Sequence, residues 1–203
     1  MISPITVARV TIMTGLLLSL FVGCKEDESN PAGGNNPPPS SQIYPLKSGN
    51  RWIFSSQRVN PDTVTVSLIT VNDRQVYHLL GEDDLNFFTG GSNSGLFYQA
   101  NDLWAVYGGV EQLLIPQTRS VGTTSYPHVT DTLSTDTLSV VSTNDQIIVP
   151  AGTFQCYQYK LVWYQGANVY NYWIADGVGI VKLYRQRSGG TTNTYELVSY
   201  IVN

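Results

Sequence analysis

Gln155–Tyr164 reads QCYQYKLVWY, and this stretch decides the fold class. Large apolar or aromatic side chains occupy every second position, and smaller or polar side chains occupy the positions between them. The apolar set is Tyr157, Tyr159, Leu161 and Trp163, and the alternate set is Cys156, Gln158 and Lys160. Side chains alternate between the two faces of a β-strand, so this pattern predicts a strand with one buried face and one face in water.

The same period recurs along the chain. In Asp62–Val71, DTVTVSLITV, the valines and leucine alternate with threonine and serine. No window shows sustained apolar spacing of three and four residues. The sequence therefore predicts an all-β fold of about ten or eleven antiparallel strands. A single curved sheet, a half-barrel and a sandwich all accommodate this number, and one short helix within Glu82–Gly95 is also compatible with it.

Turn residues separate the expected strands. Asn72-Asp73 joins two strand-like runs, and Gln165–Val169 and Arg187–Thr192 place Gly and Asn where a positive φ is easiest. Val149–Phe154, VPAGTF, has Pro at the second and Gly at the fourth position of an expected type I turn. These positions favour hairpins between neighbouring strands.

The N-terminus has the features of a targeting segment. Arg9 precedes a mostly apolar stretch, Val10–Val22, which is shorter than the roughly 20 residues that a membrane-spanning helix needs. Its length is typical of the central region of a secretory signal peptide. A small residue, Gly23, then precedes Cys24 directly.

This arrangement resembles the lipobox of bacterial lipoproteins, whose preferred pattern is Leu-(Ala/Ser/Val)-(Gly/Ala)-Cys. Here Phe21-Val22-Gly23-Cys24 stands in that place, with Phe in the position of Leu. The resemblance implies that the thiol of Cys24 receives a diacylglycerol and that the bond between Gly23 and Cys24 is cut. The following KEDES resembles the signal that sends some Gram-negative lipoproteins to the cell surface. The expected location is the outer membrane, at its periplasmic face or at the cell surface.

Three regions follow from these patterns: a signal peptide at 1–23, a lipidated and disordered tether at 24–42, and one β-rich domain at 43–203. The tether contains SNPAGGNNPPPSSQ, which is too polar to bury a core and is stiffened by three consecutive prolines. With Cys24 acylated, Cys156 is the remaining thiol and the domain has no internal disulfide. The domain is expected to be a monomer.

Two blocks, Tyr44–Ser56 and Val149–Tyr184, resemble a group of uncharacterised bacterial envelope proteins. They contain YPLKSGNRWIFSS, VPAGTF and GVGIVK. The resemblance implies a β-rich fold related to the half-barrels of lipoprotein carriers and carries no activity. In these blocks Gly49-Asn50 and Asp176-Gly177 are expected turns, and Gly177 and Gly179 bracket an expected bulge or tight bend. The expected core residues are Trp52, Phe54, Trp173 and Ile174.

The sequence lacks the residue patterns that nucleic-acid binding, metal binding and nucleophilic catalysis require. A formal net charge of −4 offers no attraction for nucleic acid. His78 and His128 have no companion ligands, so no metal and no cofactor are expected. Gly81–Asn86, GEDDLN, is interpreted as a solvated loop. Gly90–Gly95, GGSNSG, lacks the strand and helix of a nucleophile elbow. No catalytic residue is assigned.

The face formed by Tyr157, Tyr159, Leu161 and Trp163 is the candidate ligand face, since Tyr and Trp suit stacking on sugars or lining an apolar cavity. The same face can equally be plain core. The leading hypothesis is a non-catalytic domain that binds an apolar small molecule, a glycan or an envelope protein. The alternatives are a hydrolase of envelope polymers and a purely structural surface module.

Overall fold

The computed structural model describes residues 42–57, 60–86, 93–125, 136–163 and 166–203. These residues form twelve strands and no helix, so the all-β prediction is confirmed and the short helix considered within Glu82–Gly95 is not found in the described part of that segment. The strands are β1 Arg51–Ser56, β2 Asp62–Val71, β3 Arg74–Leu80, β4 Ser94–Gln99, β5 Asp102–Tyr107, β6 Val110–Ile115, β7 Thr124–Ser125, β8 Thr137–Val149, β9 Gly152–Trp163, β10 Asn168–Ala175, β11 Gly179–Gln186 and β12 Thr192–Ile201.

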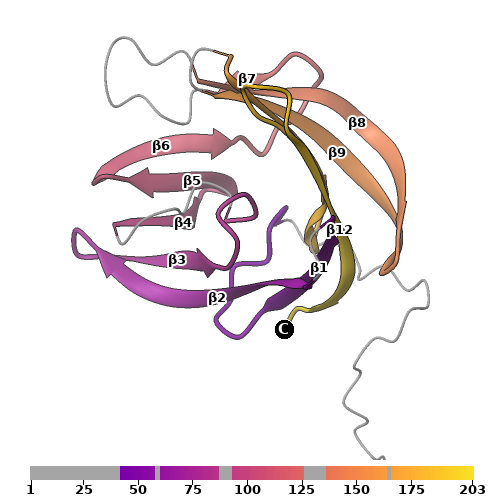
Figure 1. Cartoon of the computed structure of the whole chain (residues 1–203). Helices are drawn as coiled ribbons and strands as arrows, with labels where there is room; N and C mark the ends of the chain where they lie inside the picture. The colour runs from indigo at the N-terminus through magenta and orange to yellow at the C-terminus, as the bar shows by residue number, and fades with distance from the viewer. Residues whose placement is uncertain (1–41, 58–59, 87–92, 126–135, 164–165) are drawn as a thin grey trace, which may run out of the picture.

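All twelve strands belong to one antiparallel sheet, in the order β6-β5-β4-β3-β2-β1-β12-β11-β10-β9-β8-β7. The sheet curls into a nearly closed ring, with β2 to β6 on one side and β8 and β9 on the other (Figure 1). Its two edge strands meet, because the hydroxyl of Ser125 in β7 donates to the carbonyl of Leu114 in β6 over 2.7 Å. This bond covers part of both sheet edges, which would otherwise offer unpaired backbone groups.

Most of the core lies inside the ring. Alternate side chains from many strands point inward and are fully buried, among them Trp52, Leu79, Leu96, Leu183 and Tyr195. A smaller cluster of Val71, Val76, Phe97 and Val106 is buried separately. The ring interior is therefore filled by side chains, as in other small barrels.

The predicted turns are present where they can be observed. Asn72 and Asp73 have φ values of 48° and 63°, the conformation of a two-residue hairpin turn. Gly177 and Gly179 also have positive φ, at 73° and 94°, on either side of Val178. The register between β10 and β11 shifts at Trp173/Ile174, so the bend predicted here from the glycines is confirmed and a bulge adjoins it.

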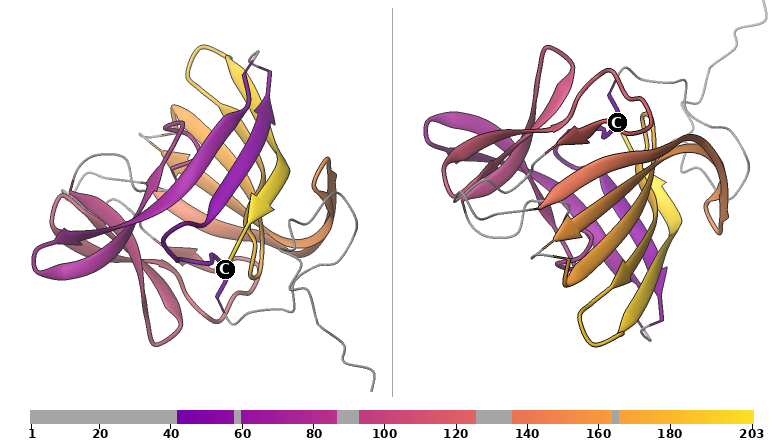
Figure 2. Two further views of the ribbon diagram at one scale, coloured as in Figure 1. Left: turned by 90° about the horizontal axis from the view of Figure 1, so that it is seen from below. Right: turned by 90° about the horizontal axis from the view of Figure 1, so that it is seen from above.

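The β8–β9 hairpin extends beyond the ring wall. Two register shifts in β8, between Val140 and Asp145, mark the point where it bends. Its far end runs beside β12 (Figures 1 and 2), where the amide of Ala151 donates to the carbonyl of Leu197 over 3.0 Å. The two halves of this hairpin consequently bury opposite faces.

Residues 42–50 enter the ring at one end. The carbonyl of Gln42 accepts a bond from the amide of Gly177, in the turn between β10 and β11, over 2.9 Å. We call the end of the ring that contains Gln42 and Gly177 the entry end. The opposite end, where β9 ends at Trp163 and β11 is followed by Arg187, is the distal end. Among the described residues no helix is long and apolar enough to cross a membrane.

Candidate functional site

The candidate ligand face on β9 runs the length of the ring. Tyr159 and Leu161 point inward, opposite Tyr172 and Tyr170 of β10, and each of the two is only 2% exposed. Tyr157 is half-buried at the entry end, while Trp163 is 39% exposed at the distal end. Because so little of either side chain is accessible to solvent, almost no space large enough for a water molecule lies next to Tyr159 or Leu161. Within this face, the side chains that a ligand can reach are those at its two ends.

The side of β9 that was expected to face water is not exposed along its whole length. The side chain of Cys156 is buried at 1% exposure, and the neighbouring Phe154 on the same face is buried as well. Lys160, further along that face, is exposed as expected. The cause is the bend in the β8–β9 hairpin. In the half of the hairpin that extends beyond the ring wall, the buried face of β9 is the one with Phe154 and Cys156. Cys156 is therefore a small packed residue, and burial raises the pKa of its thiol to about 12.

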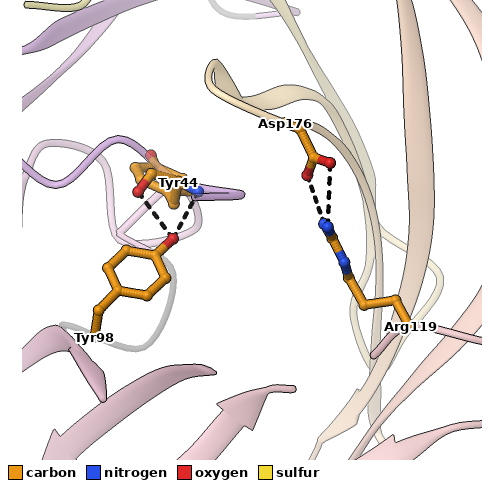
Figure 3. Close-up of polar contacts among 4 residues, drawn as sticks. All are labelled: Tyr44, Tyr98, Arg119 and Asp176. Atoms are coloured by element: carbon orange, nitrogen blue, oxygen red, sulfur yellow. Dashed lines mark hydrogen bonds and ion pairs between the residues drawn. The ribbon is translucent and has the colours of Figure 1, made fainter. Parts of the chain in front are cut away.

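An ion pair occupies the entry end. Arg119, in the connection between β6 and β7, donates from Nη1 and Nη2 to the two carboxylate oxygens of Asp176 over 2.5 and 3.1 Å (Figure 3). The guanidinium carbon of Arg119 also lies 4.1 Å from the ring centroid of Tyr157. Arginine is well suited to this position, since its planar group pairs with a carboxylate at the edge and with an aromatic ring at the face.

Beside this pair, Tyr98 of β4 holds the entering chain. Its hydroxyl accepts from the amide of Tyr44 over 3.0 Å and donates to the carbonyl of the same residue over 3.1 Å (Figure 3). Burial raises the pKa of Tyr98 to about 12, although its bond with the Tyr44 backbone acts in the opposite direction. The ring of Tyr44 lies 5.1 Å from that of Trp52, whose indole donates to the carbonyl of Val178 over 2.6 Å. These contacts fix the entry end, and nothing in them resembles a reaction centre.

The distal end contains a buried charge cluster. Asp84, 5% exposed, forms ion pairs with Arg185 and with Arg187, and its Oδ2 accepts from the hydroxyl of Tyr195 over 2.8 Å. The interpretation of GEDDLN as a solvated loop is therefore wrong for Asp84 and for Leu85, which is also buried. No local pattern indicates this burial, because Arg185 lies on a strand about a hundred positions later in the chain.

The aromatic and charged groups of the distal end adjoin one another. The rings of Trp163 and Tyr170 are 6.1 Å apart between centroids. The pKa of Tyr170 is raised by burial and lowered in part by the nearby guanidinium of Arg187. Arg187 itself is 49% exposed and lies 3.4 Å from Asp84 through Nη2 and Oδ1. An exposed indole, an exposed guanidinium and a fixed carboxylate thus share one end of the ring.

Neither a metal centre nor a nucleophile emerges from the described residues. No three of their His, Cys, Asp and Glu side chains gather as metal ligands would. His78 bonds through Nδ1 to the carbonyl of Ser94 over 2.9 Å, while His128 lies outside the described residues. In Gly90–Gly95, positions 90–92 are also outside them, and Ser94 and Gly95 belong to β4.

The predicted signal peptide and tether also lie outside the described residues, which begin at Gln42. Gly23 and Cys24, the predicted cleavage and lipid-attachment positions, therefore have no structural description. The assignment of Cys24 stays a prediction from the sequence.

No protein-family model matches the chain. No curated protein sequence matches it either. Among solved structures, it is similar to a "putative lipoprotein" from Parabacteroides distasonis ATCC 8503, with 12% identity, a TM-score of 0.39, and coverage of 79% of this chain and 98% of the other. It is also similar to a "putative exported protein with YmcC-like fold" from Bacteroides fragilis NCTC 9343, with 11% identity, a TM-score of 0.42, and coverage of 78% and 98%. Because both TM-scores are below 0.5, the function has to be argued from the residues of this chain.

Proposed function

We propose that this protein is a lipid-anchored protein of the bacterial cell envelope, in which a non-catalytic β ring binds a ligand or partner. One observation carries the anchor: Gly23-Cys24 follows a short apolar stretch and precedes the charged KEDES. An apolar stretch of this length suits export. A cysteine at its end supplies the thiol that a lipid modification needs.

The entry end supports this arrangement. The tether reaches the ring at Gln42, which bonds to Gly177 on the turn between β10 and β11. A fully extended chain spans at most about 3.6 Å per residue, so the residues between Cys24 and Gln42 can hold the ring up to about 60 Å from the membrane. The distal end, on the other side of the ring, is then free to meet a ligand.

Binding fits the charged groups better than hydrolysis does. A glycoside hydrolase needs two carboxyl groups, about 5–10 Å apart, that are available to a substrate and to water. Asp84 is instead held by Arg185, Arg187 and Tyr195, and Asp176 is held by Arg119. These are the arrangements of structural ion pairs. An exposed Trp163 at the same end of the ring as an exposed Arg187 favours a binding role over a purely structural one.

The anchor is tested by growing cells that express the protein with radiolabelled palmitate. The native chain should incorporate label, and Cys24→Ser should not, because the acceptor thiol is gone. Cys156→Ala is the matched control, since it removes the other cysteine and should leave labelling unchanged. Label retained by Cys24→Ser would contradict the proposal, and so would the absence of label from the native chain.

A further inference from the structure

The distal end of the ring combines two exposed side chains whose chemistry is complementary. Trp163 presents a partly exposed, flat apolar surface, and Arg187 presents an exposed set of N–H donors. Tyr170 connects these two residues, because its ring lies 6.1 Å from that of Trp163 and its hydroxyl lies near the guanidinium of Arg187. The buried carboxylate of Asp84 holds Arg187 in place through an ion pair over 3.4 Å.

These groups are held in place before any ligand arrives. Arg185 and Tyr195 fix the carboxylate of Asp84 from inside the ring, and both are almost completely buried. The ring of Tyr170 is fixed in turn by stacking on Tyr172, with centroids 6.1 Å apart and planes within 9°. A surface that is already ordered loses less entropy when it binds, which makes specific recognition feasible.

A further polar group lies under the same end. Asn193 pairs across the ladder with Arg185, on the row of inward-facing residues that includes Tyr170. Its side chain is more than nine-tenths buried, and its Oδ1 has no hydrogen-bond partner among the described residues. A buried acceptor without a partner costs free energy that a hydroxyl or amide donor would recover.

Sugars match this combination of surfaces. A pyranose ring presents apolar C–H groups on one face and hydroxyl groups around its edge. The C–H face stacks on an indole, and neighbouring hydroxyls accept from guanidinium groups. A lipid guest would need apolar walls in place of these charges, and a simple anion would not use the indole.

We infer that the distal end, through Trp163 and Arg187, is a glycan-binding site. Trp163 stacks on a sugar ring and Arg187 donates to its hydroxyls, while Asp84 holds the guanidinium of Arg187 in position. This inference rests on the proposed role of the ring as a binding module and names its ligand class. It does not depend on the lipid anchor.

The test measures glycan binding to the full-length protein in a detergent without a sugar headgroup, by isothermal titration calorimetry. The probes are maltohexaose, chitohexaose and hexagalacturonic acid, which differ in stereochemistry and charge. At least one should bind saturably. Trp163→Ala should weaken that binding by about tenfold or more, as truncation of a central aromatic contact does. Trp163→Tyr, which keeps a stacking ring, should stay within about threefold of the native affinity.

Two further variants separate the possible results. Trp104→Ala is the matched control, because Trp104 packs on Phe97 in the separate cluster and should leave affinity unchanged. Arg187→Gln should weaken binding of neutral and acidic probes alike. No saturable binding of any probe would overturn the inference. Binding that survives Trp163→Ala, or binding of the acidic probe alone that depends only on Arg187, would also overturn it.

The result is independent of lipidation. Cys24→Ser should bind the same probe with unchanged affinity even though it carries no lipid. Failure of the glycan assay with normal palmitate labelling would therefore reject the glycan site and leave the anchor standing. Normal glycan binding without labelling would reject the anchor and leave the site standing.

Discussion

Arg119 and Asp176 are 57 positions apart in the chain and form a two-point ion pair that joins the segment after β6 to the turn after β10. Their side chains are 12% and 25% exposed, respectively. This pair ties two distant parts of the sheet together beside the point where the tether enters. It belongs to the stability of the ring, and its loss should be measurable.

Asp176→Asn should lower the free energy of unfolding by about 1–3 kcal/mol, because a mostly buried guanidinium loses its charged partner. Urea denaturation measures this change. Glu111→Gln is the matched control: it removes a similar ion pair, with Arg74, whose side chains are 41% and 42% exposed. That change should cost less than about 1 kcal/mol. Equal losses in the two variants would contradict the structural role of the Arg119–Asp176 pair.

Tyr98→Phe should cost about 1–3 kcal/mol, because the amide and carbonyl of Tyr44 both lose the hydroxyl that bonds them. Native-state hydrogen exchange should show faster exchange at the amide of Tyr44. Tyr184→Phe, at a half-buried position on β11, is the comparison and should change stability little. Unchanged exchange at Tyr44 in Tyr98→Phe would show that this hydroxyl does not hold the entering segment.

Alkaline pH should destabilise the ring. Burial raises the pKa of Tyr98 from 10.0 to about 12 and also raises those of Tyr44, Tyr159 and Tyr172. At a pH between 10.0 and about 12, Tyr98 has lost its proton in the unfolded chain and keeps it in the folded chain. The stability contribution is therefore complete below about pH 10 and is lost as pH rises through about 12. Each such tyrosine can remove up to about 1.4 kcal/mol per pH unit.

Urea denaturation between pH 8 and 12 measures this dependence. Tyr98→Phe should make the decline less steep above pH 10, since one titrating group is gone. A stability that stays flat to pH 12 would contradict the burial of these hydroxyls.

Truncation of Trp52 and truncation of Trp163 should lower the stability of the ring by very different amounts. Trp52 is completely buried, so Trp52→Ala should cost about 3–5 kcal/mol. Trp163 is 39% exposed, and Trp163→Ala should cost less than about 1 kcal/mol. Thermal and urea unfolding of both variants check this. A large loss on Trp163→Ala would mean that the residue is core and would remove the basis of the distal site.

Local features of the fold were predictable from the sequence. The alternation in Asp62–Val71 correctly indicated a strand with Val64 and Val66 buried, because that signal depends only on neighbouring residues. Leu68, on the same face, is 44% exposed, and further along β2 the buried side chain is Val71 of the opposite face, in the separate cluster. Alternation predicts which face is apolar, and only the neighbouring strands decide how far along a strand the burial extends.

The sites depend on contacts that no local pattern encodes. Asp84 looked like part of a polar loop, and its partners Arg185 and Tyr195 come from β11 and β12. The side of β9 that contains Cys156 was expected to face water, and the bend in the β8–β9 hairpin buries Cys156. Which arginine and carboxylate side chains are buried together cannot be recognised before the strand order is known. Trp163 was singled out from the sequence, but Arg187, at the same end of the ring, was not.

The proposed membrane anchor of the ring is a lipid on Cys24. Intact-mass spectrometry of the protein purified from the membrane fraction tests this most directly. The expected result is a chain that begins at Cys24 and carries the added mass of a diacylglycerol on that residue. A chain that retains residues 1–23, or one that begins elsewhere and carries no lipid, would contradict it.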